Sequence, residues 1–344
     1  MATTYAIPNG AQYMAATLYT GNGSAVTVTN GAPGASFQPD FVWMKSRSNA
    51  TDNTQWDSVR GATKYLISNA TNAEATYAGG LTAFNTNGYS IGDGSAINTN
   101  AYTYVGWQWK AGGTAVSNTA GSITSSVSAN PTAGFSVATF TCPASGNFTV
   151  GHGLGVTPAM IIVKDRSNAN GWPVWHQSLG TPTQNYLALN TTSAVITGNT
   201  SIWANTAPTS SVVSFGTNIC FNPSANAVMY AWAPIAGYSA FGSYTGNGSA
   251  DGTFVYLGFR PKFVMTKKSS GTEDWAIIDS SRSSYNLQGA DLYADLAIAE
   301  GTSGYDLLSN GIKFRSSGGS WNASGATYIY AAFAENPMKY ANAR

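Results

Sequence analysis

Side chains able to perform acid–base or nucleophilic catalysis are few in this sequence and do not form a recognisable set. His152 and His176 are the two histidines. No Ser-His-Asp order, Gly-x-Ser-x-Gly elbow, His-Glu-x-x-His pair or phosphate-binding loop accompanies them. The glycine-rich run at 151–155 precedes an expected strand instead of a helix, which makes it a weak candidate for a dinucleotide site. The sequence therefore predicts neither catalytic residues nor a cofactor.

Carboxylates are concentrated in the last third of the chain, where two chemistries have to be weighed. A pair of carboxylates about 5–9 Å apart could hydrolyse a glycan, and clustered carboxylates could bind calcium. These acids do not recur at matching positions of the repeat described below, and Asp93-Gly94 and Asp251-Gly252 are typical of ordinary turns. We therefore favour solvent-facing loop charges, and we predict a protein that is not an enzyme and has no metal ligands. The acids concerned are Glu273, Asp274, Asp279, Asp291, Asp295, Glu300 and Asp306.

One block of sequence occurs three times without a gap, at Phe37–Arg60, Val156–Leu179 and Phe259–Arg282. In each copy a proline precedes a short apolar run, a lysine follows that run, and an Asp or His comes later. Such repetition indicates one structural unit used three times. A position that accepts either Asp or His suits the orientation of a hairpin better than catalysis. The structural repeat markers are Pro39, Pro158, Pro261, Lys45, Lys164, Lys267, Asp57, His176 and Asp279.

Two of the copies carry an acid–arginine pair at equal positions, Asp57 with Arg60 and Asp279 with Arg282. Such a pair could bind a ligand, or it could clamp the hairpin to the segment that follows it. The middle copy lacks both charges and must still fold, so we favour the clamp.

The local patterns favour strands almost everywhere. Each block is typical of a β-hairpin that has proline at the start of its first strand, and Asn-Gly pairs mark turns between strands. One segment, Asp291–Glu300, has the apolar spacing of a helix. The predicted fold is all-β, with three tandem β-sandwich modules of jelly-roll or lectin-like type. Their expected bounds are 1–112, 135–237 and 238–344, with 113–134 as a connector or an extra edge strand.

Composition limits the possible partners. The 344 residues include 9% charged residues and carry a formal net charge of +1, so the clustered cations that bind nucleic acid are missing. No apolar run approaches the ~20 residues of a membrane span, and the first residues lack the features of a signal peptide. A neutral surface rich in amides and hydroxyls is typical of a protein held in an assembly or facing neutral sugars.

Cys142 and Cys220 are the two cysteines, and both belong to the middle module. Two cysteines do not make a disulfide framework. We interpret them as buried, reduced thiols, with a single bridge that closes the middle module as the alternative.

The chain contains 10 tryptophans and 19 tyrosines, and aromatic rings can either fill a core or bind partners and sugars. Rings on the repeated strands are predicted to be core residues: Trp43, Trp56, Trp107, Trp175 and Trp232. Three others lie beside Gly, Asn or Ser in expected loops, and these are our candidates for contact with a partner or a glycan: Trp172, Trp203 and Trp321.

Several stretches, taken together and in order, resemble a family of tailed-bacteriophage proteins of marine and cyanophage type, labelled tail-fibre-like or virion structural proteins. The resemblance covers essentially the whole chain. The stretches are Tyr19–Ser24, Phe37–Leu66, Trp107–Asn118, Gly237–Gly248, Asn322–Gly325 and Tyr328–Glu335.

The resemblance implies a virion component, on the tail or on the capsid exterior, that is assembled in the host cytoplasm. We expect a non-enzymatic structural protein, a tail fibre or peripheral tail protein acting in assembly or host attachment through many weak contacts. A capsid decoration protein or head fibre, and a carbohydrate-binding adhesin, are the alternatives. The expected partners are other virion proteins, further copies of the chain in a trimer and, for the adhesin, a host-surface glycan, with neither nucleic acid nor membrane insertion.

Overall fold

The computed structural model of the chain describes residues 7–31, 36–180, 184–220, 222–283 and 285–335. Almost all regular structure in these ranges is antiparallel β-strand, which confirms the all-β class. The helical turns are short: η1 (Gly10–Gln12), α1 (Ser95–Asn98) and α2 (Gly319–Asn322). Over the described ranges, no helix has the length and apolar character needed to cross a membrane.

The first third of the chain forms two packed sheets. Their strands are β1 (Met14–Thr20), β2 (Val26–Val28), β3 (Phe41–Ser46), β4 (Thr54–Asp57), β5 (Lys64–Ile67), β6 (Ala75–Thr76), β7 (Leu81–Asn85), β8 (Gly88–Ile91) and β9 (Thr103–Trp109). The larger one, here the first sheet, has the order β1-β9-β3-β4-β5-β6, and the smaller has the order β2-β8-β7. Val42, Met44 and Trp56 of the first sheet pack against Leu81 and Tyr89 of the smaller one.

The middle of the chain repeats this plan. Its strands are β10 (Val116–Asn118), β11 (Ser125–Asn130), β12 (Phe135–Thr141), β13 (Phe148–Gly151), β14 (Met160–Asp165), β15 (Pro173–His176), β16 (Leu187–Ala188), β17 (Val212–Phe215) and β18 (Asn226–Trp232). The second sheet has the order β10-β11-β12-β18-β14-β15-β16, and β13 pairs with β17. The stretch 113–134 thus supplies β10 and β11, two strands at the edge of the second sheet.

The last part of the chain forms one sheet of eight strands. They are β19 (Ser239–Thr245), β20 (Phe254–Tyr256), β21 (Pro261–Lys268), β22 (Ala276–Asp279), β23 (Gln288–Tyr293), β24 (Gly301–Leu308), β25 (Gly311–Phe314) and β26 (Thr327–Ala334). This third sheet has the order β19-β26-β21-β22-β23-β24-β25-β20. The helix predicted at Asp291–Glu300 is wrong, because Leu292 and Tyr293 pair in register with Ile277 and Ala276 of β22.

Each large sheet has the same central ladder. The repeated hairpin gives β3-β4, β14-β15 and β21-β22, and the aromatic strands β9, β18 and β26 pair with its first strand. Phe41 faces Trp109, Met160 faces Trp232, and Phe263 faces Phe333. Equivalent positions in the block therefore occupy equivalent positions in the sheets.

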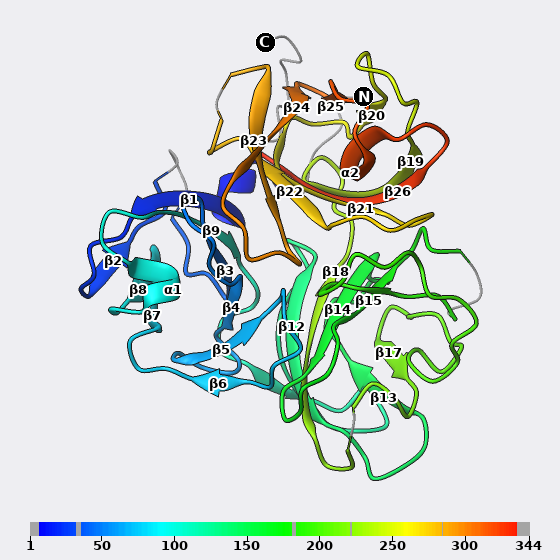
Figure 1. Ribbon diagram of the computed structural model, residues 1–344. Helices are drawn as coiled ribbons and strands as arrows, with labels where there is room; N and C mark the ends of the chain where they lie inside the picture. The colour runs from blue at the N-terminus through cyan, green and yellow to red at the C-terminus, as the bar shows by residue number, and fades with distance from the viewer. Residues whose placement is uncertain (1–6, 32–35, 181–183, 221, 284, 336–344) are drawn as a thin grey trace.

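The aromatic strands do not all pack within their own third of the chain. Figure 1 shows three lobes, blue to cyan, green, and yellow to red, around a common centre. One hydrophobic cluster spans all three lobes. We call it the shared core. Separate clusters fill the outer parts of the first and second lobes, so the aromatic strands of the three predicted modules are buried partly in a core that the modules have in common. The shared core includes Phe41, Trp43, Trp107 and Trp109, then Phe135, Met160, Ile162, Tyr230 and Trp232, and then Phe241, Phe263, Met265 and Phe333.

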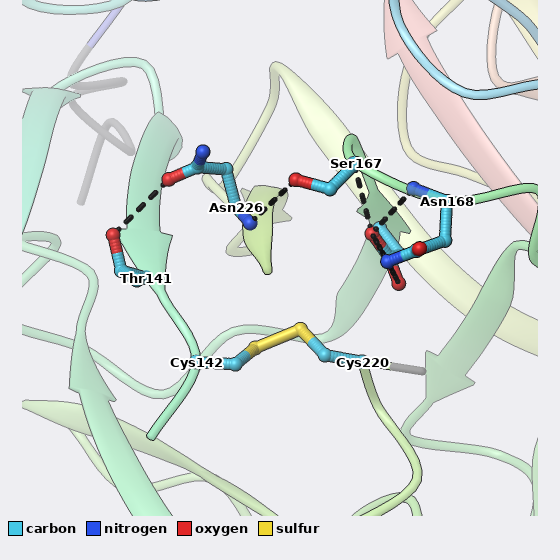
Figure 2. The surroundings of a disulfide bond; sticks show 7 residues. Thr141, Cys142, Ser167, Asn168, Cys220 and Asn226 are labelled. Atoms are coloured by element: carbon cyan, nitrogen blue, oxygen red, sulfur yellow. Dashed lines mark hydrogen bonds between the residues drawn. A yellow bond between two sulfur atoms is a disulfide. The ribbon is translucent and has the colours of Figure 1, made fainter. Parts of the chain in front are cut away.

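The cysteines form a disulfide. Cys142 follows β12, Cys220 follows β17, and both side chains are buried in the second lobe, with Cα atoms 6.5 Å apart. Figure 2 shows the bridge beneath the bond that joins Thr141 to Asn226. The interpretation as reduced thiols is therefore wrong, and the single bridge is correct. Cys142 directly follows β12, and Cys220 lies shortly before β18 begins at Asn226. The two cysteines meet because β12 and β18 are neighbours in the second sheet.

Candidate functional site at the junctions between the three sheets

The repeat markers gather where the three sheets meet. The three marker prolines are buried and stand at or just before the first strand of each hairpin. The marker lysines are fully buried near the ends of those first strands, β3, β14 and β21. Lys164 Nζ donates hydrogen bonds to the carbonyl oxygens of Asn168 and Asn170, at 3.2 and 2.8 Å. It also reaches the carbonyl oxygen of Thr71 in the first lobe, at 3.0 Å.

The other two lysines are held in the same way. Lys267 donates to the carbonyl oxygens of Glu273 and, in the second lobe, of Thr192, and Lys45 donates to that of Thr51. Burial lowers the pKa of all three lysines to about 8. Because carbonyl oxygens take the place of water around each ammonium group, the lysines stabilise loops and lobe contacts.

The acids of the repeated slot each bind an aromatic side chain of another lobe. Tyr230 of the second sheet donates its hydroxyl hydrogen to Asp57 Oδ2 of the first, at 2.7 Å. Trp107 of the first sheet donates its indole N–H to Asp279 Oδ2 of the third, at 2.9 Å. Tyr230 and Trp107 hold the same ladder position in β18 and β9. The two contacts are therefore equivalent members of a cyclic set.

His176 completes the set between the second and third lobes. Its Nε2 lies 3.1 Å from the carbonyl oxygen of Tyr330, while its Nδ1 accepts a hydrogen bond from Ser178 N at 3.1 Å. The ring is therefore neutral with its hydrogen on Nε2, and burial lowers its pKa to about 4. The third sheet has Ala331 at the ladder position of Trp107 and Tyr230, so no side chain there can donate to an acid. A histidine that donates to the backbone replaces the acid.

Each buried acid begins a chain of ion pairs that crosses to another lobe. Asp57 binds Arg60, whose Nη1 lies 3.1 Å from Glu74 Oε2. Glu74 in turn binds Arg166 of the second lobe at 2.8 Å. Burial alone would raise the pKa of Glu74, but the hydrogen bond from Arg166 and the charge of Arg60 hold it below its usual value. The equivalent chain joins Asp279, Arg282, Glu300 and Arg47, at 2.6, 3.3 and 2.9 Å.

At the remaining junction, all four charged positions are occupied by uncharged residues. A backbone bond identifies the equivalent places: Glu74 N donates to Arg166 O at 2.8 Å, and Glu300 N donates to Arg47 O at 2.8 Å. The same bond runs from Val195 N to Ser269 O at 3.0 Å. His176 and Leu179 occupy the positions of the acid and the first arginine. The three junctions are therefore alike in backbone, and two of them carry charge.

A family model described as a domain of unknown function, DUF7483, matches residues 9–337. The chain belongs to the DUF7483 family. The matched range includes all three sheets, so the family unit contains the shared core and all three junctions. No curated protein and no solved structure matches the chain.

Trp172, one of the predicted partner contacts, is a junction residue of this DUF7483 chain. It is fully buried, and its Nε1 donates to the carbonyl oxygens of Ile67 and Ala70 in the first lobe, at 3.1 and 3.0 Å. Trp275 at the same block position donates to Ala188 O in the second lobe at 2.9 Å. The expectation that Trp172 is an exposed contact is wrong, because its ring extends from the loop into the contact between two lobes.

Trp203 and Trp321 are buried as well. Trp203 packs on Phe215, with ring centroids 5.7 Å apart. Trp321 donates its indole N–H to Ser303 Oγ at 3.0 Å. Both were predicted to be partner contacts, and neither ring is available at the surface. The five tryptophans predicted to be core residues are indeed buried, at 8% exposure or less.

The outer members of the ion-pair chains were not recognised from the sequence. Glu74 and Glu300 lie outside the repeated block, so its alignment could not reveal them. Arg47 and Arg166 hold the same place within the block, and that shared position was the signal available for them. The clamp interpretation of the acid–arginine pairs agrees with the buried geometry of both pairs.

The acids of the third lobe are mostly engaged with neighbouring groups. Asp295 accepts a hydrogen bond from Trp275 N at 2.9 Å, and burial with the nearby charge of Asp274 raises its pKa to about 7. Asp306 and Asp251 pair with Arg315. Among the residues that the structure describes, no group of three or more His, Cys, Asp and Glu side chains is placed to hold a metal ion. What the junctions can do chemically is fix three sheets to one another.

Proposed function

We propose that this chain is a non-enzymatic structural component of a bacteriophage virion, a tail fibre or peripheral tail protein that acts in assembly or host attachment. The observation that carries the proposal is the use of the repeated ionisable residues. The marker lysines, the residues of the Asp or His slot and the arginines of the two acid–arginine pairs are buried, and they bind backbone or side chains within the hairpins and across the junctions. Such residues support a rigid particle part rather than a reaction.

Two further features support a role outside the cell. The chain has 9% charged residues, far fewer than the roughly 25% of ordinary soluble domains, which suits a surface covered by neighbouring subunits. The buried disulfide suits a protein that works in an oxidising environment. We propose the virion exterior as that location, with other virion proteins and further copies of the chain, as trimers, for partners.

The test uses particles from infected cultures in which this chain is expressed. Virions are purified on a density gradient, their proteins are identified by mass spectrometry, and antibody against the purified chain is located on the particles by electron microscopy. We expect the chain in the particle fraction and the antibody on the tail. Antibody on the head would favour the capsid decoration protein instead. A chain found in the cell lysate and absent from the particles would refute both.

The oligomeric state is measured separately, by light scattering on the purified protein. A mass of three chains supports the trimer. A monomer at every concentration tested would contradict it without bearing on the location of the protein in the virion.

A further inference from the structure

The first lobe contains a hollow of about 300 Å³ that none of the junction contacts uses. It lies on the outer side of the first sheet, between strands β4 and β5 and the helical turn α1. Trp56, Tyr65 and Tyr77 provide aromatic walls, and Ile97 and Asp52 complete its lining together with short loop residues. The Trp56 and Tyr65 rings lie 5.3 Å apart at an interplanar angle of 32°. Tyr77 is 45% exposed.

In the third lobe a side chain occupies the space that corresponds to this hollow. Its turn α2 corresponds to α1, because Asn98 and Asn322 hold the same loop: each Oδ1 accepts a backbone N–H at 2.9 Å, from Asn22 and Asn247. The residue before that asparagine is Ile97 in the first lobe and Trp321 in the third.

The two residues differ greatly in size. The Trp321 ring packs between Tyr305 and Phe314, with centroids 6.1 and 5.8 Å away, and only 3% of the residue is exposed. On the facing strand the exchange is reversed, since Trp56 corresponds to Ile278. In the first lobe, therefore, the tryptophan is Trp56 at the bottom of the hollow. In the third lobe it is Trp321, whose ring occupies the corresponding space.

Glycines bring the backbone close to these rings. A Cβ atom on Gly80 would lie 2.1 Å from Trp56 Cη2, and one on Gly79 would lie 2.0 Å from Asp93 Oδ1. Any other residue at these positions would push the rim of the hollow away from its floor. Tyr77 Oη, which lies 3.3 Å from Asp93 Oδ1, is placed at the rim by the same approach.

The lining selects a class of ligand. The partly exposed rings of Tyr65 and Tyr77 can stack on the apolar faces of sugar rings, and the carboxylate of Asp52, which also lines the hollow, can accept hydrogen bonds from hydroxyl groups. Neither Lys nor Arg lines the hollow, so it offers no charge partner for phosphate, sulfate or a sugar acid. Its volume is at the lower limit for ligand pockets, which suits the end of a short glycan.

We propose that this hollow binds a neutral saccharide. The inference goes beyond the proposed structural role and does not depend on it, because binding is measured on the purified chain whether or not the chain belongs to a virion.

The experiment compares three variants on an array of glucose-, galactose-, mannose- and N-acetylhexosamine-terminated oligosaccharides, with sialylated and sulfated glycans beside them. Ile97→Trp introduces the third lobe's own residue and should fill the hollow. Tyr77→Ala removes an exposed wall with little effect on folding. Tyr256→Ala is the matched control, because this tyrosine is 68% exposed on the third lobe, away from the hollow. Urea unfolding confirms that each variant is folded.

We expect wild type and Tyr256→Ala to bind the same neutral glycans, and both other variants to bind them at least tenfold more weakly. Quenching of tryptophan fluorescence by the bound sugar should be lost with Ile97→Trp. The proposal is overturned if no neutral glycan binds at millimolar concentration, if only anionic glycans bind, or if Tyr77→Ala binds as wild type does. Should Ile97→Trp fail to fold, Tyr77→Ala decides the question alone.

Discussion

Replacing His176 by aspartate tests the account of the uncharged junction. Aspartate is the residue at this slot in the other two copies, where Asp57 receives a hydrogen bond from Tyr230 and an ion pair from Arg60. At the third junction the slot faces the carbonyl oxygen of Tyr330, 3.1 Å from His176 Nε2. An aspartate there would meet an acceptor instead of a donor.

The expected decrease in the free energy of unfolding of His176→Asp has two parts. The hydrogen bond to the carbonyl contributes about 1 kcal/mol. A buried carboxylate without its cation costs about 3–5 kcal/mol. The variant can limit the second part by taking up a proton, which costs about 4 kcal/mol for an aspartate at pH 7. We therefore expect His176→Asp to lower the free energy of unfolding by about 4–5 kcal/mol at pH 7.

The difference in free energy of unfolding between wild type and His176→Asp should almost disappear at acidic pH, because the stabilities of the two proteins respond to pH in opposite directions. In wild type, folding lowers the pKa of His176 to about 4. Its contribution to stability is therefore present above the unfolded value of about 6.5 and is lost as the pH falls toward 4. In the variant, burial raises the pKa of the new carboxyl group, so protonation at low pH relieves its cost. Relative to pH 7, the free energy of unfolding at pH 4.5 is lower by roughly 2 kcal/mol in wild type and higher by about 3 kcal/mol in the variant.

Urea unfolding of three variants at pH 7 and pH 4.5 checks this reasoning. His176→Asn is the matched control, since it has the shape of aspartate without the charge, and it should lose only about 1 kcal/mol. His176→Asp with Leu179→Arg restores the acid–arginine pair of the other copies and should recover much of the loss. If the Asp and Asn variants unfold at the same urea concentration at pH 7, the buried-charge argument is refuted.

Three further predictions concern stability. Serine at both Cys142 and Cys220 should lower the free energy of unfolding by up to about 4.5 kcal/mol, because the bridge closes a loop of 78 residues; a urea midpoint equal to that of the oxidised wild type would contradict it. Folding raises the pKa of Asp295 to about 7, so its ionisation costs stability as the pH rises from about 4 through 7; between pH 5 and pH 8.5 the Asp295→Asn variant should gain about 3 kcal/mol in free energy of unfolding relative to wild type, and parallel pH profiles would contradict it. Trp172→Ala removes a fully buried ring and two bonds across a junction and should cost about 3–5 kcal/mol; an unchanged urea midpoint would show that the ring is not structural.

The sequence allowed the class of fold and the repeated hairpin to be predicted, because both depend on local patterns. Alternating burial, turn residues and the spacing of the block are all local. The sequence did not reveal the shared core. In β3 every residue is buried: Phe41 and Trp43 face the shared core, while Val42 and Met44 face the smaller sheet of their own lobe. A strand with a nearly continuous apolar run is typical of a sheet covered on both faces, and this signal pointed to the shared core.

The site residues that were mispredicted share a physical cause. Trp203 and Trp321 stand among small polar residues, and such neighbours indicate a loop but not its exposure. Whether a loop is buried depends on which part of the chain covers it, and that part is distant in sequence. Trp321 lies beneath Tyr305 and Phe314 of the same lobe. Tyr77, which is exposed at the hollow of the first lobe, lies outside the repeated block. The repeat therefore gave no indication that this tyrosine lines a pocket.

The uncharged junction shows that its residues behave as a set. Removing one member of a buried ion-pair chain leaves another charge without a partner, at a cost of about 3–5 kcal/mol, whereas exchanging the whole chain for uncharged groups is close to neutral. All four charged positions differ at this junction, together with the aromatic donor of the facing strand. Those five residues are His176, Leu179, Val195, Ser269 and Ala331. Because Ala331 cannot donate to an acid, histidine is the consistent choice at the slot, and without the acid the arginines have no function there. The repeat therefore tolerates complete replacements at a junction and resists single ones.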